Sequence, residues 1–197
     1  MPATPEESRM SHARPAAEDV PLIPVSQRTA LAVPLALGIF AADLASKWLV
    51  FRACDARIDP SGPHADAERV IDVIPGFFDL QCVMNPGAFS GWFGGWYWFL
   101  IVVSIAALVA IGAYVLKGRV RSRLFLVSLA CIAGGTAGNL YDRTLYAGVR
   151  DFFHFFVTVG GKTWTWPNFN IADSAICVGV GLWILLELAI SRARRAA

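Results

Sequence analysis

The sequence predicts an all-α membrane protein with four transmembrane helices and a small extracytoplasmic β-sheet resting on the membrane. Of its 197 residues, 56% are hydrophobic and only 16% are charged, against about 45–50% and about 25% in soluble domains. Four separate apolar stretches each approach the roughly 20 residues that a helix needs to cross a bilayer. The formal net charge of +2 leaves no overall basic field for nucleic acid, so we expect no nucleic-acid partner.

The expected spans cover residues 29–51, 92–116, 124–141 and 171–190, within a domain that we place at residues 28–192. Residues 1–27 are rich in Pro, Ala, Glu, Ser and Arg without a hydrophobic period, and we expect a disordered cytoplasmic tail there. A second short cytoplasmic tail is expected at residues 193–197. A cleavable secretory signal is the weaker interpretation of the first span, because a long polar tail precedes it and charged residues interrupt it.

The distribution of positive charge predicts how the chain is oriented. Basic residues concentrate in the short loop after the second span, which has no acidic residue, and at the C-terminal end. Such segments stay in the cytoplasm, so we expect both termini there and residues 52–91 and 142–170 outside. The basic residues are Lys117, Arg119, Arg121 and Arg123 in the loop and Arg192, Arg194 and Arg195 at the end.

The first outer segment changes character toward its end. From Val70 to Met84, apolar and polar residues nearly alternate around a Pro-Gly pair at 75–76, which predicts short β-strands joined by a turn. Cys54 and Cys82 flank the polar part of this segment, and the sequence leaves open whether they form a disulfide. The four cysteines show no CxxC spacing, and with three scattered histidines they predict no metal site.

Charged residues in or beside membrane spans are costly, which makes them candidates for function. Asp43 and Lys47 are four residues apart and lie on one helix face, as an ion pair requires. A structural lock between helices and a direct role both remain open for this pair. Asn139, Asp142 and Arg143 gather at the outer end of the third span. They are either functional groups or part of an ordinary helix end whose carbonyls are capped by the Asn and Arg side chains.

Two further carboxylates have contrasting surroundings. Aromatic neighbours at 152–156 favour the neutral form of Asp151, whereas Asp173 begins the fourth span, where the helix dipole favours negative charge. An aspartic protease needs this contrast, because one carboxylate activates water while a protonated one polarises the scissile carbonyl. Ordinary roles as a loop charge and a helix-start residue are the alternative.

Five motifs, in this order over about residues 30–190, resemble the lipoprotein signal peptidase (signal peptidase II) family of bacterial membrane aspartic peptidases. The resemblance implies an intramembrane aspartic endopeptidase that removes the signal peptide from diacylglyceryl-modified prolipoproteins, cleaving before the lipidated cysteine. It implies no cofactor or metal, a monomer that contacts membrane lipids, and a site near the outer face of the bacterial cytoplasmic (inner) membrane. The motifs are Asp43-Leu44-Ala45-Ser46-Lys47, Asn85-Pro86-Gly87-Ala88, Gly134 to Arg143, Val149 to Phe152 and Phe169-Asn170-Ile171-Ala172-Asp173.

Carried over by these motifs, Asp151 and Asp173 would be the catalytic pair, with Asp142 as a third candidate. The chain departs from the family pattern at Phe89, which directly follows the Asn85 motif, and at Arg150, where an apolar residue is usual. A cation adjacent to Asp151 favours its ionised form, so we assign the proton to neither carboxyl. Supporting or substrate-binding roles are implied for Asp43, Lys47, Asn85, Gly87, Asn139, Asp142, Arg143, Asn170 and Ala172.

Two other classes of membrane protein fit the charged residues less well. A small proton-coupled transporter or channel would also carry intramembrane charges. However, Asp142, Asp151 and Asp173 are expected near the outer interface rather than the midplane, and the chain shows no paired repeats. A purely structural membrane subunit is the third class, and it predicts that carboxamide substitutions of all three aspartates are tolerated.

Overall fold

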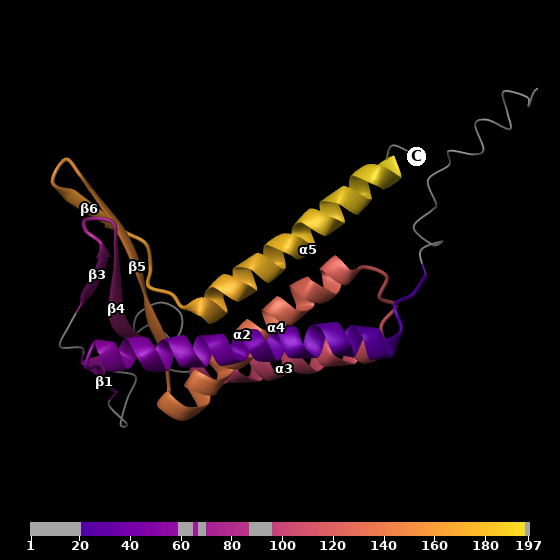
Figure 1. Ribbon diagram of the computed structural model, residues 1–197, viewed down its shortest axis with the longest axis horizontal. Coiled ribbons are helices and arrows are strands. Elements are labelled where there is room, and N and C mark those ends of the chain that lie inside the picture. The colour runs from indigo at the N-terminus through magenta and orange to yellow at the C-terminus, as the bar shows by residue number, and fades with distance from the viewer. Residues whose placement is uncertain (1–20, 59–64, 67–69, 87–95, 196–197) are drawn as a thin grey trace, which may run out of the picture.

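The computed structural model describes residues 21–58, 65–66, 70–86 and 96–195. Within these ranges, four helices are long and apolar enough to cross a membrane: α2 (Val25–Ala53), α3 (Trp96–Lys117), α4 (Arg123–Tyr146) and α5 (Ile171–Arg195). An antiparallel sheet lies at one end of the helices, and the start of α2 and the end of α5 lie at the other (Figure 1). The predicted four-helix membrane fold with a small sheet is therefore confirmed.

The helices extend beyond the predicted spans. The first begins at Val25, so residues 25–27 of the expected tail are helical, whereas residues 1–20 lie outside the described ranges, as do residues 92–95 of the expected second span. The third continues to Tyr146 and the fourth to Arg195. Hydropathy marks only the part of a helix that lies in hydrocarbon, whereas a helix continues into polar surroundings wherever its side chains find partners.

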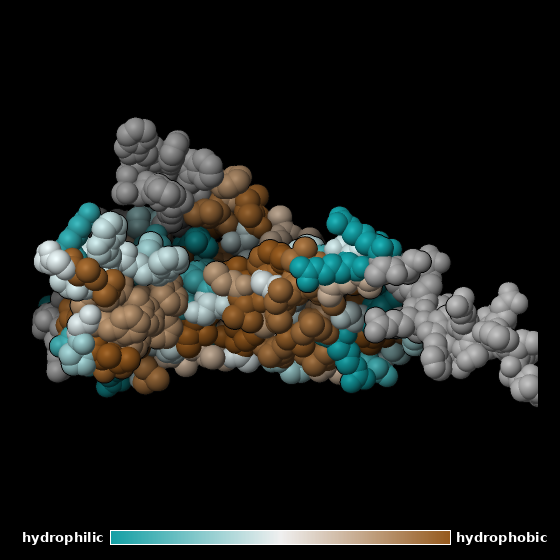
Figure 2. Space-filling view, turned by 90° about the horizontal axis from the view of Figure 1, so that it is seen from above, coloured by the Kyte–Doolittle hydropathy of each residue, from teal (hydrophilic) through white to brown (hydrophobic). Residues whose placement is uncertain are grey.

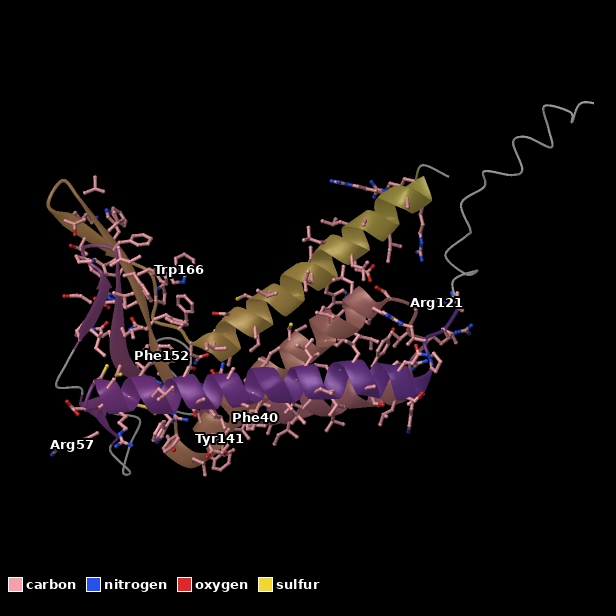
Figure 3. The ribbon with its side chains drawn as sticks, viewed as in Figure 1. Phe40, Arg57, Arg121, Tyr141, Phe152 and Trp166 are labelled. Atoms are coloured by element: carbon pink, nitrogen blue, oxygen red, sulfur yellow. The ribbon has the colours of Figure 1, made fainter. Side chains whose placement is uncertain are left out.

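Apolar side chains cover the outer faces of the helices, as a lipid environment requires. Val102, Val109 and Leu185 are all exposed, and Figure 2 shows hydrophobic residues gathered over the middle of the helical region. Polar residues such as Arg57 and Arg121 lie at opposite ends of that region (Figure 3). The chain is therefore a multi-pass membrane protein.

Helix α4 lies at the centre of the bundle and contacts its neighbours through glycines. A Cβ atom added at Gly138 would collide with the carboxylate of Asp43 on α2, and one added at Gly135 would collide with the backbone oxygen of Ala172 on α5. Because these glycines lack side chains, the backbones of the helices approach closely. This close approach brings polar groups of α2, α4 and α5 together.

We expect Gly138→Ala to lower the stability of the protein, because the added methyl group forces the Asp43 carboxylate out of its position. Overpacking of this kind costs about 1–3 kcal/mol. Gly112→Ala on α3 is the matched control, since a Cβ there meets no atom within 4 Å. Thermal unfolding in the same detergent compares the variants, and equal midpoints for both would contradict the close packing.

The main sheet has four antiparallel strands in the order β3 (Ile71–Ile74), β4 (Phe78–Asn85), β5 (Val149–Val159) and β6 (Lys162–Thr165). A separate two-stranded sheet pairs β1 (Arg57–Ile58) with β2 (Ala65–Asp66). The two strands predicted over 70–84 are confirmed, and Gly76 takes a positive φ of 77° in their turn.

The hairpin of β5 and β6 was not predicted, because the aromatic run at 152–156 does not alternate with polar residues. The sequence feature that indicates this hairpin is the pair Gly160 and Gly161, which take φ values of 60° and 77° in the turn. Two glycines between residues of high strand propensity favour the two-residue turn of a hairpin.

A core cluster joins the end of α2 to the sheet. It consists of Phe51, Cys54, Cys82, Met84 and Phe152, and Figure 3 shows Phe152 between the sheet and α2. Cys54 and Cys82 are free thiols in the structure, both buried. Burial, together with the neighbouring Cys54, raises the pKa of the Cys82 thiol. The cluster holds β4 and β5 against the end of α2, where the polar groups of the helices meet.

Candidate active site

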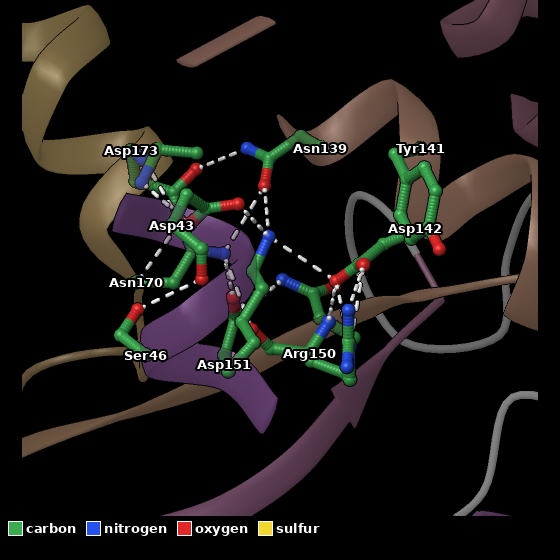
Figure 4. Close-up of polar contacts among 12 residues, drawn as sticks. Asp43, Ser46, Asn139, Tyr141, Asp142, Arg150, Asp151, Asn170 and Asp173 are labelled. Atoms are coloured by element: carbon green, nitrogen blue, oxygen red, sulfur yellow. Dashed lines mark hydrogen bonds and ion pairs between the residues drawn. The ribbon is translucent and has the colours of Figure 1, made fainter. Parts of the chain in front are cut away.

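A buried ion network lies where α2 meets α4. The predicted pair of Asp43 and Lys47 is present, with 2.7 Å between Lys47 Nζ and Asp43 Oδ2, and both side chains are fully buried. Lys47 Nζ also donates to Asn139 Oδ1 at 3.1 Å and lies 3.1 Å from Asp142 Oδ2 (Figure 4). The other oxygen of Asp43 accepts a hydrogen bond from the backbone nitrogen of Ala172 at 2.9 Å. Asp43 and Lys47 thus connect α2 to both α4 and α5.

Asn139 and Asp142 lie inside α4, which continues to Tyr146. Asn139 therefore does not cap the helix end, which was one of the two predicted interpretations for this residue. The side chains of both residues point into the bundle and contact charged groups of other elements. Arg143 is half-buried on the same helix, and the charges of Asp151 and Asp173 act on its guanidinium.

The start of α5 is a reciprocal cap. Asn170 directly precedes the helix, and its Oδ1 accepts a hydrogen bond from the backbone nitrogen of Asp173 at 2.9 Å. Asp173 Oδ2 in return accepts from the backbone nitrogen of Asn170 at 3.1 Å. This arrangement corresponds to a capping box. It fixes the half-buried Asp173 in the first turn of α5, at the helix start where the sequence placed it.

Asp151 lies on β5 and is almost completely buried, with 1% of its surface exposed. Its Oδ2 accepts a hydrogen bond from Asn85 Nδ2 at 2.9 Å, and its Oδ1 accepts one from Asn170 Nδ2 at 2.7 Å. Pairing of β4 with β5 brings Asn85 beside Asp151, because Asn85 is aligned with Val149. Both oxygens of the carboxyl group are therefore held by amide donors.

Asn170 and Asn139 link the two carboxyl groups. Asn170 donates to Asp151 from its side chain and to Asp173 from its backbone. Asn139 donates to Asp173 Oδ1 at 2.7 Å and accepts from Asn170 Nδ2 at 3.1 Å (Figure 4). The two carboxylates, which are 22 residues apart in the sequence, thus share one hydrogen-bond network.

The environment of Asp151 favours its protonated form. Burial, and next the charge of Asp173, raise the pKa of Asp151 to about 7. Hydrogen bonds from Asn85 and Asn170 and the charge of Lys47 act in the opposite direction without cancelling the rise. Arg150 was expected to favour the ionised form, but its guanidinium turns to Asp142, 2.7 Å from Oδ1. The pKa of Asp151 is therefore raised, not lowered.

This raised pKa predicts how stability depends on pH. A carboxyl group whose pKa rises from 3.8 to about 7 on folding contributes stability fully below about pH 4, and this contribution is lost as the pH rises through 7. Asp151→Asn removes the contribution at every pH. We therefore expect the difference in thermal unfolding midpoint, Asp151→Asn minus wild type, to increase by several degrees from pH 5 to pH 8. A constant difference across this range would contradict the prediction.

The structure brings together most of the predicted site residues. Gly87 lies outside the described ranges, so its place in the site stays a prediction. The sequence connected Arg150 only to its neighbour Asp151 and missed its contact with Asp142, because the pairing of a strand residue with a helix residue depends on tertiary structure. Within the described ranges, no three His, Cys, Asp or Glu side chains form a metal-ligand set. The residues in contact are Asp43, Lys47, Asn85, Asn139, Asp142, Asp151, Asn170, Ala172 and Asp173.

An apolar groove of about 450 Å³ runs between α2 and α5 beside the site. Its walls include Gly38 and Ala42 of α2 and Ile171, Ser174 and Val178 of α5. Ser174 follows Asp173 directly. The groove therefore reaches the start of α5, the helix that carries Asp173, and follows the apolar part of the two helices.

Known proteins are similar to this chain in sequence and in fold. The family model of signal peptidase II matches residues 35–189. Lipoprotein signal peptidase of Neisseria gonorrhoeae is 39% identical over 159 residues, covering 77% of this chain and 85% of the relative. That of Symbiobacterium thermophilum is 34% identical over 162 residues, covering 82% and 97%.

A solved structure of a bacterial membrane enzyme has a TM-score of 0.64 with this chain at 27% identity, and the match covers 80% of this chain and 92% of the other. The sequence comparison and the structure comparison thus both match most of the chain, the first to signal peptidase II and the second to a bacterial membrane enzyme. The chain belongs to the signal peptidase II family of membrane peptidases.

Proposed function

We propose that the chain is an aspartic endopeptidase that removes the signal peptide from diacylglyceryl-modified prolipoproteins, cleaving before the lipidated cysteine. The curated relatives are named lipoprotein signal peptidases, which supports this substrate class. The observation that carries the proposal is the bridge of Asn170, which holds the carboxyl groups of Asp151 and Asp173 in one network. Paired carboxyl groups in different protonation states are the requirement of aspartic proteolysis.

The geometry supports a division of roles. Asp173 accepts two hydrogen bonds from Asn139 and Asn170, which stabilise its charged form, so it acts as the base that takes a proton from water. Asp151, with its raised pKa, holds a proton that polarises the scissile carbonyl and then passes to the leaving amine. In each cycle Asp173 takes one proton from water and Asp151 gives one proton to the leaving amine. Transfer of the proton from Asp173 back to Asp151 then restores the starting state.

The surroundings support a substrate that approaches from the bilayer. The apolar groove between α2 and α5 offers a surface for the lipid part of the substrate beside Asp173. Arg121 and the other basic residues of its loop lie at the end of the helices opposite the sheet (Figure 3). By the positive-inside rule, that end, with both termini, faces the cytoplasm. The site then lies near the outer face of the cytoplasmic membrane, and residues 28–192 act as a monomeric peptidase domain in contact with lipids, without a cofactor.

The test uses the full chain purified into lipid vesicles. It is incubated with a synthetic prolipoprotein carrying diacylglycerol on its cysteine and, in parallel, with the same precursor lacking the lipid. We expect cleavage of the lipidated precursor, with a product whose first residue by mass spectrometry is the modified cysteine. Cleavage at another bond, or equal cleavage of both precursors, would contradict the proposed specificity. A transporter or a structural subunit would leave both precursors intact.

A further inference from the structure

Arg150 is a buried cation beside the carboxyl pair that the proposed chemistry does not use. It directly precedes Asp151 on β5, and successive side chains of a strand point to opposite sides. Its guanidinium turns toward α4, where it lies 4.7 Å from the centre of the Tyr146 ring and contacts Asp142. Only 5% of Arg150 is exposed. Because a buried charge requires a partner, the contact with Asp142 explains how Arg150 is tolerated there.

Two cations hold Asp142. Arg150 donates from its terminal nitrogen to Oδ1 at 2.7 Å, its Nε lies 3.2 Å from both oxygens, and its backbone nitrogen donates to Oδ2 at 2.9 Å. Lys47 Nζ lies 3.1 Å from the same Oδ2. A guanidinium suits such a forked contact better than an ammonium group does. Asp142 is therefore neutralised by Arg150 as well as by Lys47. Lys47 also contacts Asp43, and its positive charge acts on Asp151.

The charges around the pair balance only when Arg150 is included. If Asp151 and Asp173 share one proton, the described groups of this cluster carry three negative and three positive charges. Asp79 and His154, a second titratable pair on the same sheet, contact each other at 2.9 Å. The groups that face the carboxyl pair or Arg150 are Asp43 and Lys47 from α2, Asp142, Arg143 and Tyr146 from α4, and the uncharged amide of Asn85 from β4.

We propose that Arg150 is a positioning residue that sets the pH range of the proposed hydrolysis. By neutralising Asp142, it keeps the net charge of the buried cluster at zero when Asp151 and Asp173 together carry one negative charge. The inference rests on the proposed function. Without Arg150, the excess negative charge of Asp142 makes every further ionisation in the cluster less favourable. The shared proton of the pair is then lost at higher pH.

The experiment compares pH profiles of kcat for wild type, Arg150→Met and the charge-balanced double variant Arg150→Met/Asp142→Asn. We expect Arg150→Met to move the whole profile by about one pH unit toward higher pH. The double variant removes one positive and one negative charge, so its profile returns to that of wild type. Arg150→Lys keeps the charge and the wild-type profile with a lower rate. Arg52→Met, which removes an exposed cation next to Trp48, is the control and leaves the profile unchanged.

Infrared titration of the Asp151 carboxyl group in the same proteins gives a second readout that needs no cleavage. An unshifted profile and titration in folded Arg150→Met would overturn the inference, as would a shift that persists in the double variant. A merely structural role lowers the rate or the stability without moving either curve, and so counts against the proposal. If wild type cleaves nothing, the proposed function fails, while the titration still decides whether Arg150 controls protonation of the pair.

Discussion

Asp151→Asn and Asp173→Asn are each expected to lower kcat for cleavage of a diacylated prolipoprotein by about 10³-fold or more. Removal of a general acid or base costs about 10²–10⁴-fold, and the proposed hydrolysis needs Asp173 as the base and Asp151 as the acid in every cycle. Asparagine keeps the shape of the side chain and its place beside Asn170. Single-turnover kinetics with saturating enzyme measure the loss without interference from product release.

Asp79→Asn is the matched control for this pair of variants. Asp79 is also a buried carboxylate on the sheet, but it binds His154 at 2.9 Å and has no contact with the carboxyl pair. We expect its cleavage rate to stay within a few-fold of wild type. Normal cleavage by folded Asp151→Asn or Asp173→Asn would show that the assignment of the pair is wrong.

Lys47→Met is expected to have the largest effect on stability. Lys47 is fully buried and contacts two carboxylates, Asp43 and Asp142. Removing one partner of a buried ion pair leaves uncompensated charge and costs about 3–5 kcal/mol. Unfolding of the variant in detergent, followed by circular dichroism, measures the loss. Since methionine fills a similar volume, the effect reports charge rather than an empty cavity.

Lys162→Met provides the comparison, because Lys162 is exposed and lies over the ring of Trp164 at 4.1 Å. Its removal is expected to change the unfolding free energy by less than about 1 kcal/mol. The variant Lys47→Met/Asp43→Asn removes one of the stranded carboxylates and should recover part of the loss. Equal stability of Lys47→Met and Lys162→Met would contradict a structural role for the ion network.

The parts of the fold that could be predicted are those specified by local pattern. The length of the apolar stretches predicted the four helices. The i,i+4 spacing predicted the ion pair of Asp43 and Lys47, and the structure confirms it with 2.7 Å between Lys47 Nζ and Asp43 Oδ2. The alternation before Met84 likewise gave two strands. The hairpin of β5 and β6 was not predicted, because aromatic residues lie on both faces of β5 and the alternation of apolar and polar residues is lost.

The candidate site was only partly predictable, for a different reason. The resemblance supplied its residues, but contacts such as that of Asn170 with Asp151 depend on how α5 meets β5. The direction of a side chain is also invisible in sequence. Arg150 neighbours Asp151 along the chain, yet it binds Asp142 on α4 because strand side chains alternate. Sequence proximity therefore suggested the wrong charge partner.

The sharing of one proton by Asp151 and Asp173 is the central claim, and infrared difference spectroscopy of the carboxyl groups tests it most directly. Wild type in lipid is titrated from pH 5 to pH 9 beside Asp151→Asn. The account predicts a protonated carboxyl band that is present at pH 6, is lost with a midpoint near pH 7, and is absent from Asp151→Asn. A band that survives in Asp151→Asn, or no protonated carboxyl group at pH 6, would contradict it.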